Sequence, residues 1–224
     1  IYICGGKINI TSTTDAIQAE TTLTIEKGEI NLKTGGVSEN SSKTSGGKDN
    51  PQWGKWGQED SSTTEEDTAS AKGLKAGGDI KISNATITTD TSDDSIHSNS
   101  NVTIESGTFN LKSGDDGIHA DTSTVINNGN IVIEKSYEGI EGSNVTINGG
   151  TIELTASDDG INSAGGSDSS SMGGRMGQNS FTENSDIYIK ITGGKVTVDA
   201  SGDGLDSNSN LIIEGGEIYV NGPT

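Results

Sequence analysis

Apolar and polar residues alternate with a period of two in short stretches that recur along the chain. The pattern is clear in NVTIESGTFNL (101–111), NVTINGGTIEL (144–154) and LIIEGGEIYV (211–220), where a glycine separates two alternating runs. Alternation with this period is typical of a β-strand with one buried face and not of a helix. A glycine between the runs suits a bend that needs an unusual backbone angle. The sequence therefore predicts pairs of short strands joined at a glycine.

The strand pattern recurs at a spacing of 22 residues. One landmark is the apolar residue that closes each acidic turn, and it falls at Ile17, Leu74, Ile96, Ile118, Ile140, Ile161 and Leu205. A second landmark lies in the first strand of each pair, at Ile3, Ile25, Ile82, Ile104, Ile126, Ile147, Ile191 and Ile213. The gaps in both series are 21 or 22 residues, apart from one of 57 and one of 44. Two independent landmarks with one spacing indicate an internal repeat.

A unit of this size cannot bury its own apolar face, whereas a stack of such units can. We therefore expect one all-β domain over residues 1–224, a parallel β-helix of about eight 22-residue coils with strands in register. A right-handed coil is expected, as in most large β-helices. A narrow tube also fits the low hydrophobic fraction of 28%. The two long gaps mark Gly/Ser-rich loop insertions at about 37–71 and 165–186.

Acidic residues occupy the turn before the first landmark, most clearly in SGDDGIHA (113–120) and SDDGINS (157–163). In a stack, equivalent carboxylates about 5 Å apart repel by roughly 3 kcal/mol at an effective dielectric of about 20. Because Ca²⁺ binds carboxylate and carbonyl oxygens, and these turns offer both, we expect several Ca²⁺ ions along this edge. The expected ligands are Asp93, Asp94, Asp115, Asp116, Glu138, Asp158, Asp159, Asp203 and Asp206. The alternative is that Asp and Gly only form turns, with solvated carboxylates.

Three other residues on this edge carry candidate chemistry. Lys72 stands in the acidic column between Asp15 and Asp94, and its ammonium group is expected to replace a metal ion there. His97 and His119 occupy equivalent positions in adjacent repeats. We expect them to be exposed turn histidines, with metal ligation or contact with a sugar as alternatives.

Composition narrows the classes of partner. The chain has 14 Lys and Arg against 33 Asp and Glu, a formal net charge of −19, which disfavours nucleic acid because phosphate binding needs basic residues. Metal cations and neutral or weakly charged polymers suit this surface better. A single cysteine, Cys4, allows no internal disulfide. No apolar run is long enough to form a transmembrane segment. We expect an export signal upstream of this chain to have been removed.

The repeated SDDGI-x-S followed by NVTI-x-GG-x-I resembles a family of bacterial extracellular carbohydrate-binding β-helix proteins. The resemblance covers nearly all of the chain apart from the two insertions. It implies a fold related to the calcium-dependent polysaccharide lyases of family nine, several structural Ca²⁺ ions, and a secreted or cell-surface location. By the same resemblance Asp94, Asp116, Asp159 and Asp203 are metal ligands, whereas Glu138 departs from the Asp-Asp pattern.

The resulting functional prediction is non-catalytic binding of plant cell-wall polysaccharide, either acidic (pectic acid or polygalacturonate) or cellulosic. Bound Ca²⁺ would bridge protein and uronate carboxylates. Trp53 and Trp56 in the first insertion are expected to stack on sugar rings or to anchor their loop, and Lys72 to contact the polymer. The main alternative is a pectate lyase-like β-elimination that needs Ca²⁺, with Lys72, or else Lys75 or Lys112, as the base. A purely structural role at a cell surface is a third possibility.

Overall fold

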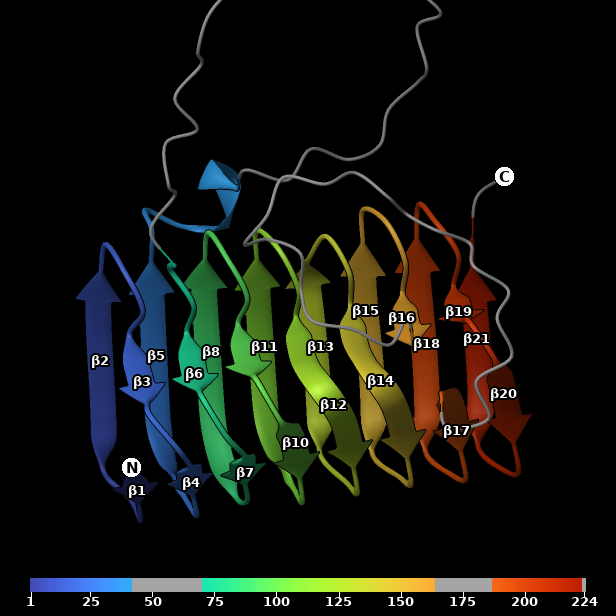
Figure 1. Ribbon diagram of the computed structural model, residues 1–224, viewed down its shortest axis with the longest axis horizontal. Helices are drawn as coiled ribbons and strands as arrows, with labels where there is room; N and C mark the ends of the chain where they lie inside the picture. Colours follow the sequence, from blue (N-terminus) through green and yellow to red (C-terminus); the bar gives the residue numbers. More distant parts are fainter. Residues whose placement is uncertain (42–69, 164–186, 223–224) are drawn as a thin grey trace, which may run out of the picture.

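The computed structural model describes residues 1–41, 70–163 and 187–222. This part of the chain is all-β, with a single turn of 3₁₀ helix, η1 (Ser38–Asn40), as its helical segment. The strands are parallel and form two curled sheets (Figure 1). None of the described helical segments is long and apolar enough to cross a membrane. The all-β class expected from the alternation is therefore confirmed.

One sheet has eight strands: β2 (Lys7–Ser12), β5 (Gly28–Thr34), β8 (Ala85–Thr91), β11 (Gly107–Ser113), β13 (Asn130–Lys135), β15 (Thr151–Ala156), β18 (Lys195–Ala200) and β21 (Glu217–Asn221). The other has thirteen: β1 (Tyr2–Ile3), β3 (Ile17–Ala19), β4 (Leu23–Ile25), β6 (Leu74–Ala76), β7 (Ile80–Ile82), β9 (Ile96–Ser98), β10 (Asn101–Ile104), β12 (Ile118–Ile126), β14 (Ile140–Ile147), β16 (Ile161–Ser163), β17 (Tyr188–Ile191), β19 (Leu205–Ser207) and β20 (Asn210–Ile213).

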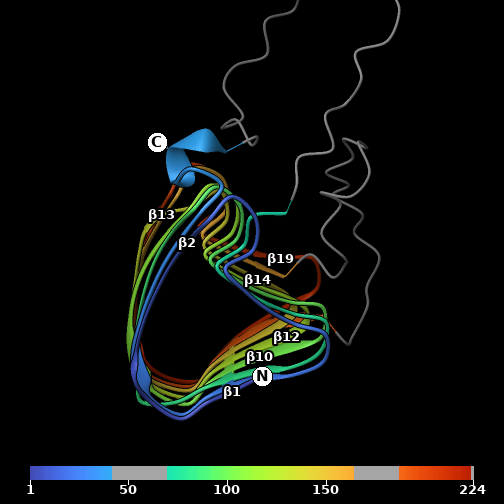
Figure 2. The same ribbon diagram turned by 90° about the vertical axis from the view of Figure 1, so that its left-hand side faces the viewer.

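The chain passes from one sheet to the other and back once in each repeat. Each strand pairs with its equivalent in the next repeat, so the eight-stranded sheet runs β2-β5-β8-β11-β13-β15-β18-β21. Viewed along the stack in Figure 2, successive turns of the chain superimpose. This arrangement is compatible with the parallel β-helix expected from the sequence, and the right hand of the coil stays a prediction.

The strand registers follow the landmarks of the sequence. Along the thirteen-stranded sheet Ile96 pairs with Ile118, and Ile118 pairs with Ile140. Likewise Ile82 pairs with Ile104, and Ile104 with Ile126. The landmarks are buried along most of the stack, and they form one continuous core with the inward residues of the eight-stranded sheet. Stacking therefore buries apolar faces that no single repeat could bury.

Glycine occupies the bend at the start of every strand of the eight-stranded sheet except β8, where Ala85 stands. Gly107 has a φ of 141°, and a Cβ atom there would lie 2.7 Å from the carbonyl oxygen of Ala85. The repeat with Ala85 at this position makes the bend differently, because Asn84, one residue earlier, adopts a φ of 49°. The exception in the sequence pattern thus has a local backbone solution.

The two expected insertions coincide with long gaps between strands. β5 ends at Thr34 and β6 begins at Leu74, and β16 ends at Ser163 and β17 begins at Tyr188. Most of both insertions lies outside the described residues. The sugar-stacking role expected for Trp53 and Trp56 falls there as well.

Candidate functional site

The acidic turns form one continuous edge of the stack. They link strands of the eight-stranded sheet to the strands that follow them, as between β11 and β12, where Asp115 and Asp116 lie. We call this feature the acidic edge and define it by Asp15, Lys72, Asp94, Asp116, Glu138, Asp159 and Asp203, together with their chain neighbours. Backbone hydrogen bonds hold its turns in file, for instance from the amide of Gly117 to the carbonyl of Glu138 at 3.0 Å.

Those backbone bonds engage the carbonyl oxygens of the turns. The carbonyl oxygens of Asp94, Asp116 and Glu138 accept amide hydrogens from the neighbouring coil. The sequence predicts turn carbonyls among the oxygen ligands for Ca²⁺. With one lone pair of these carbonyls already engaged, carboxylate side chains and water are the main oxygen ligands that the edge offers.

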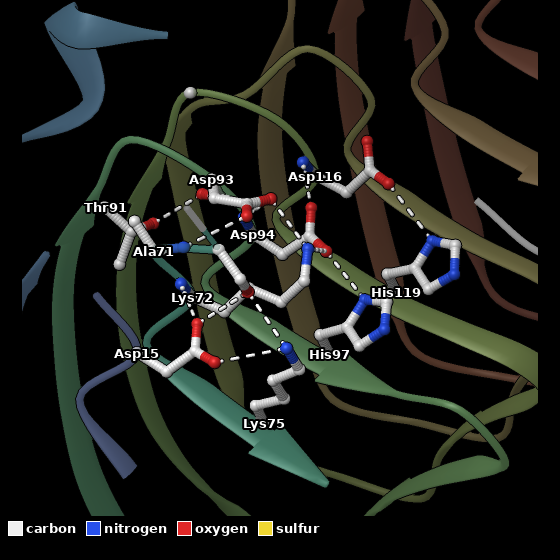
Figure 3. Close-up of polar contacts among 12 residues, drawn as sticks. Asp15, Ala71, Lys72, Lys75, Thr91, Asp93, Asp94, His97, Asp116 and His119 are labelled. Carbon is white, nitrogen blue, oxygen red and sulfur yellow. Dashed lines mark hydrogen bonds and ion pairs between the residues drawn. The ribbon is translucent and has the colours of Figure 1, made fainter. Parts of the chain in front are cut away.

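At the N-terminal end of the acidic edge, a buried lysine supplies the positive charge. The Nζ atom of Lys72 lies 2.7 Å from Oδ1 of Asp93 and 2.7 Å from Oδ2 of Asp94 (Figure 3). Burial by itself lowers the pKa of the Lys72 ammonium, but the charges of Asp94 and Asp93 outweigh it, and the pKa is raised. Lys72 therefore stays protonated, and its ammonium lies where three carboxylates, those of Asp93, Asp94 and Asp115, come together.

Asp94 is the most enclosed carboxylate of the edge. Its side chain has no exposed surface, and it accepts hydrogen bonds from Lys72, from the backbone amide of Asp116 at 2.9 Å, and from the ring of His97 at 2.7 Å. Burial by itself raises the pKa of this carboxyl, but the charge of Lys72 and the contact with His97 offset it, so the pKa is lowered. Asp94 is thus an ionised group held in a fixed position.

Three aspartates of the edge cap the backbone of the next coil. Asp15 accepts the amide of Lys72 at 2.9 Å, Asp94 that of Asp116 at 2.9 Å, and Asp159 that of Asp203 at 2.6 Å. Sequence reasoning missed this role, although the recurrence of Asp at a spacing of one repeat was a signal for it. One oxygen of each of these carboxylates is therefore engaged by the protein itself.

Further along the edge, positive charge gives way to crowded carboxylates. Burial raises the pKa of Asp116 well above its ordinary value, and burial together with the charge of Asp116 raises that of Glu138 to about 9. Burial also raises the pKa of Asp159, to about 6, although the amide of Asp203 acts against it. Each raised pKa means that the ionised group lacks sufficient neighbouring positive charge.

Asn162 lies beside this crowded stretch. Its Nδ2 atom donates to Oε2 of Glu138 at 3.0 Å. Its Oδ1 atom is buried and has no hydrogen-bond partner among the described residues. A buried amide oxygen without a donor is a costly group, and it is also an oxygen of the kind that Ca²⁺ binds.

The two histidines are buried, so the expectation that they are exposed is wrong. His97 and His119 are 6% and 0% exposed, and their rings stack with centroids 4.7 Å apart and planes inclined by 7°. They lie on the paired strands β9 and β12, directly after the acidic turns. His119 contacts three carboxylates, those of Asp116, Glu141 and Asp121, at 3.2, 2.5 and 3.0 Å.

The structure brings some of the expected metal ligands together and adds others. Asp93, Asp94 and Asp115 offer ligand atoms within 4.8 Å of one another. Asp116 groups with His119 and Glu141 in the same way, and sequence reasoning had not included Glu141. The remaining expected ligands lie at the C-terminal end, where Asp158, Asp203 and Asp206 all act on the pKa of Asp159 through their charges. Of these, Asp203 is exposed.

The lysines considered as a catalytic base are engaged in ion pairs. Lys72 is buried between carboxylates, Lys75 lies 3.1 Å from Asp15, and Lys112 lies 2.9 Å from Glu134. A general base must be able to lose its proton near neutral pH. Although burial by itself lowers the pKa of Lys72, the charges of Asp94 and Asp93 outweigh it and raise the pKa, so Lys72 does not lose its proton near neutral pH.

A comparison with family models gives a match that covers most of the chain. A model described as a carbohydrate-binding domain-containing protein matches residues 1–117 and 100–180, which together span the repeats from β1 to β16. The comparison with curated proteins found no match, and the comparison with solved structures found none either.

Proposed function

The chain belongs to the family of carbohydrate-binding domain-containing proteins, and from this premise we propose that it binds plant cell-wall polysaccharide non-catalytically, on a parallel β-helix stabilised by Ca²⁺. The family implies a carbohydrate partner. The choice of pectic acid or cellulose as the polymer, the role of Ca²⁺ and secretion from a bacterium are parts of the proposal. A carbohydrate-binding domain is consistent with an extracellular location.

The observation that carries the role of Ca²⁺ is the set of carboxylates that raise one another's pKa around Glu138 and Asp159, with Asn162 beside Glu138. Burial and neighbouring charges raise the pKa of Glu138 and of Asp159, and the buried Oδ1 of Asn162 lacks a donor. A bound cation compensates the negative charge of the carboxylates, and the amide oxygen can coordinate it through a lone pair. The donor set of this stretch is therefore all oxygen, which suits a hard cation such as Ca²⁺.

The residues that would hold Ca²⁺ are those not already neutralised by Lys72. Glu138, Asp159 and Asn162 form the centre of this set, with Asp158, Asp203 and Asp206 beside it. The Asp93–Asp94–Asp115 cluster is the exception, because the Lys72 ammonium already lies against two of its members. This supports the expectation that the lysine takes the place of one metal ion in the column.

Bound Ca²⁺ explains how a chain with a net charge of −19 can bind an acidic polymer. Without the ion, the carboxylates of the edge repel a uronate. With it, the ion contributes positive charge at the surface and shares its remaining ligand positions with the polymer. We favour this binding role over β-elimination because the lysine best placed beside the acidic turns, Lys72, is buried and stays protonated.

The test is co-sedimentation of the purified protein with insoluble polygalacturonate and with cellulose, in Ca²⁺ and in chelator. We expect polygalacturonate to retain the protein only in Ca²⁺, and the double variant Glu138→Gln, Asp159→Asn to be retained much less. Glu153→Gln, on the exposed face of β15, is the matched control and should bind like the wild type. Equal binding in chelator, or cellulose binding alone, would contradict the role of Ca²⁺.

A second measurement separates binding from cleavage. Absorbance of unsaturated uronate products is followed in the same mixtures. We expect no increase with Ca²⁺. An increase that needs Ca²⁺ and is lost in Lys72→Ala would establish the lyase alternative.

A further inference from the structure

We propose that His97, His119 and Asp121 form a second kind of metal site, which binds a divalent transition-metal ion of the Zn²⁺ type and is separate from the oxygen-rich Ca²⁺ sites. The two imidazoles lie on the paired strands β9 and β12, and Asp121 follows two residues after His119 on β12. The proposal does not depend on the carbohydrate partner, because it rests on these side chains alone.

The first argument is that both imidazoles are oriented by carboxylates behind them. Nδ1 of His97 lies 2.7 Å from Oδ2 of Asp94, and Nδ1 of His119 lies 2.5 Å from Oε2 of Glu141 and 3.2 Å from Oδ2 of Asp116. Metal-binding histidines in proteins characteristically hold one ring nitrogen against a carboxylate in this way and present the other to the metal. Here the protein supplies that support twice, on adjacent coils.

The second argument is that the outer nitrogens point to one place. Figure 3 shows Nδ1 of each ring directed at its aspartate and the other ring nitrogen directed away from the acidic edge. Because the rings are parallel to within 7° and stacked at 4.7 Å, their two Nε2 atoms lie side by side. No partner for Nε2 of His97 is found in the described part of the chain, whereas Nε2 of His119 lies 3.0 Å from Oδ1 of Asp121.

The third argument is the size of the group. Ligand atoms of His97, His119 and Asp121 all lie within 4.8 Å of one another. Zinc binds nitrogen and carboxylate oxygen at about 2.0–2.2 Å, so its ligand atoms lie closer together than this. Binding therefore requires the imidazoles to tilt toward each other at their Nε2 ends and Asp121, which is half-buried, to close on them. Three protein ligands leave a further position for water or for a bound molecule.

The donor set selects the class of metal. Two imidazole nitrogens and one carboxylate suit Zn²⁺, Cu²⁺ or Ni²⁺, whereas Ca²⁺ takes oxygen ligands. The surroundings also favour a cation. His119 lies against three carboxylates, those of Asp116, Asp121 and Glu141, at 3.2, 3.0 and 2.5 Å. A metal ion between His119 and Asp121 takes the place of the proton that these two groups otherwise share.

The chain has only two histidines, so the decisive experiment observes each of them directly. Zn²⁺ is titrated into ¹⁵N-histidine-labelled protein in the presence of millimolar Ca²⁺, and the ring nitrogens are followed by NMR. We expect one equivalent of Zn²⁺ to shift the Nε2 resonances of both His97 and His119. A shift of one ring or of neither, or displacement of Zn²⁺ by Ca²⁺, would mean that the stacked histidines are structural only.

Variants test the third ligand and the supporting carboxylate. Asp121→Asn keeps a hydrogen-bond acceptor for His119 but loses the anionic ligand, and we expect Zn²⁺ affinity to fall at least about tenfold. Glu141→Gln removes a carboxylate behind Nδ1 of His119, with an expected loss of roughly 10–100-fold. Glu134→Gln, on the eight-stranded sheet, is the matched control and should bind as the wild type does. Wild-type affinity in Asp121→Asn, or an equal loss in Glu134→Gln, would overturn the assignment.

Discussion

The ammonium nitrogen of Lys72 lies 2.7 Å from Oδ2 of Asp94, and the two side chains are 6% and 0% exposed. This pair is so enclosed that neither charged side chain can become solvated when its partner is replaced. The loss of one partner from a buried pair is therefore far more costly than the loss of one partner from an exposed pair. Along the acidic edge, Lys72 neutralises the carboxylates at the N-terminal end, whereas the carboxylates around Glu138 are crowded and raise one another's pKa.

Replacement of Lys72 by methionine should lower the free energy of unfolding by about 3–5 kcal/mol, because it leaves Asp94 ionised and buried without its cation. The measurement is equilibrium unfolding in urea, in chelator. Lys112→Met is the control, because Lys112 and Glu134 form an exposed pair, and its loss should cost no more than about 1 kcal/mol. Equal effects of the two variants would show that the Lys72 contacts contribute no more than a surface pair.

The same variant should gain more from Ca²⁺ than the wild type does. Without the ammonium, Asp93, Asp94 and Asp115 form a cluster of three carboxylates whose ligand atoms lie within 4.8 Å of one another. An ion that binds the folded state alone stabilises it, and the stabilisation grows as the ion concentration exceeds the dissociation constant of its site. We expect the rise on addition of Ca²⁺, followed by calorimetry, to be larger for Lys72→Met than for the wild type. Identical rises would indicate that Lys72 does not take the place of an ion.

Stability in chelator should fall as the pH rises from about 4.5 to about 9. Burial and the charge of Asp116 raise the pKa of Glu138 from its ordinary value of 4.5 to about 9, so over this range the folded state holds a proton that the unfolded state has lost. Stability decreases with pH wherever the folded state binds more protons. The measurement is urea unfolding at several pH values.

Glu138→Gln provides the control for this pH dependence. Glutamine cannot titrate, so the slope of stability against pH should become flatter in this variant. Its amide also remains close in size to the carboxyl group that Asn162 contacts. A slope in Glu138→Gln as steep as in the wild type would assign the dependence to other carboxylates of the edge.

Alanine at position 107 should destabilise the protein by more than alanine at position 6. Both glycines have positive φ values, 141° and 101°, which cost an alanine about 1–3 kcal/mol. A Cβ atom on Gly107 would in addition lie 2.7 Å from the carbonyl oxygen of Ala85, whereas one on Gly6 has no atom within 4 Å. Thermal unfolding of both variants compares the two effects. A larger loss in Gly6→Ala would contradict the steric argument.

Much of the fold was predictable because it is encoded locally and repeated. The alternation of apolar residues defines strands, and the spacing of 22 residues fixes which residues pair, as Ile96 does with Ile118. A one-residue change of register would turn every apolar side chain outward, so the pattern permits one register only. The expected bend glycines follow from the same repeat, and Gly107 confirms them.

The sequence by itself thus determined the all-β class, the registers, the apolar core and the file of acidic turns. The sequence also placed Lys72 in that file. Only the tertiary structure decided that Asp94 and Asp159 accept hydrogen bonds from backbone amides of the next coil, and that His97 is buried with its ring against Asp94 and stacked on His119. The physical reason is that a repeat pattern fixes where backbones lie, whereas charge balance depends on which side chains of neighbouring coils meet and on how much water reaches them.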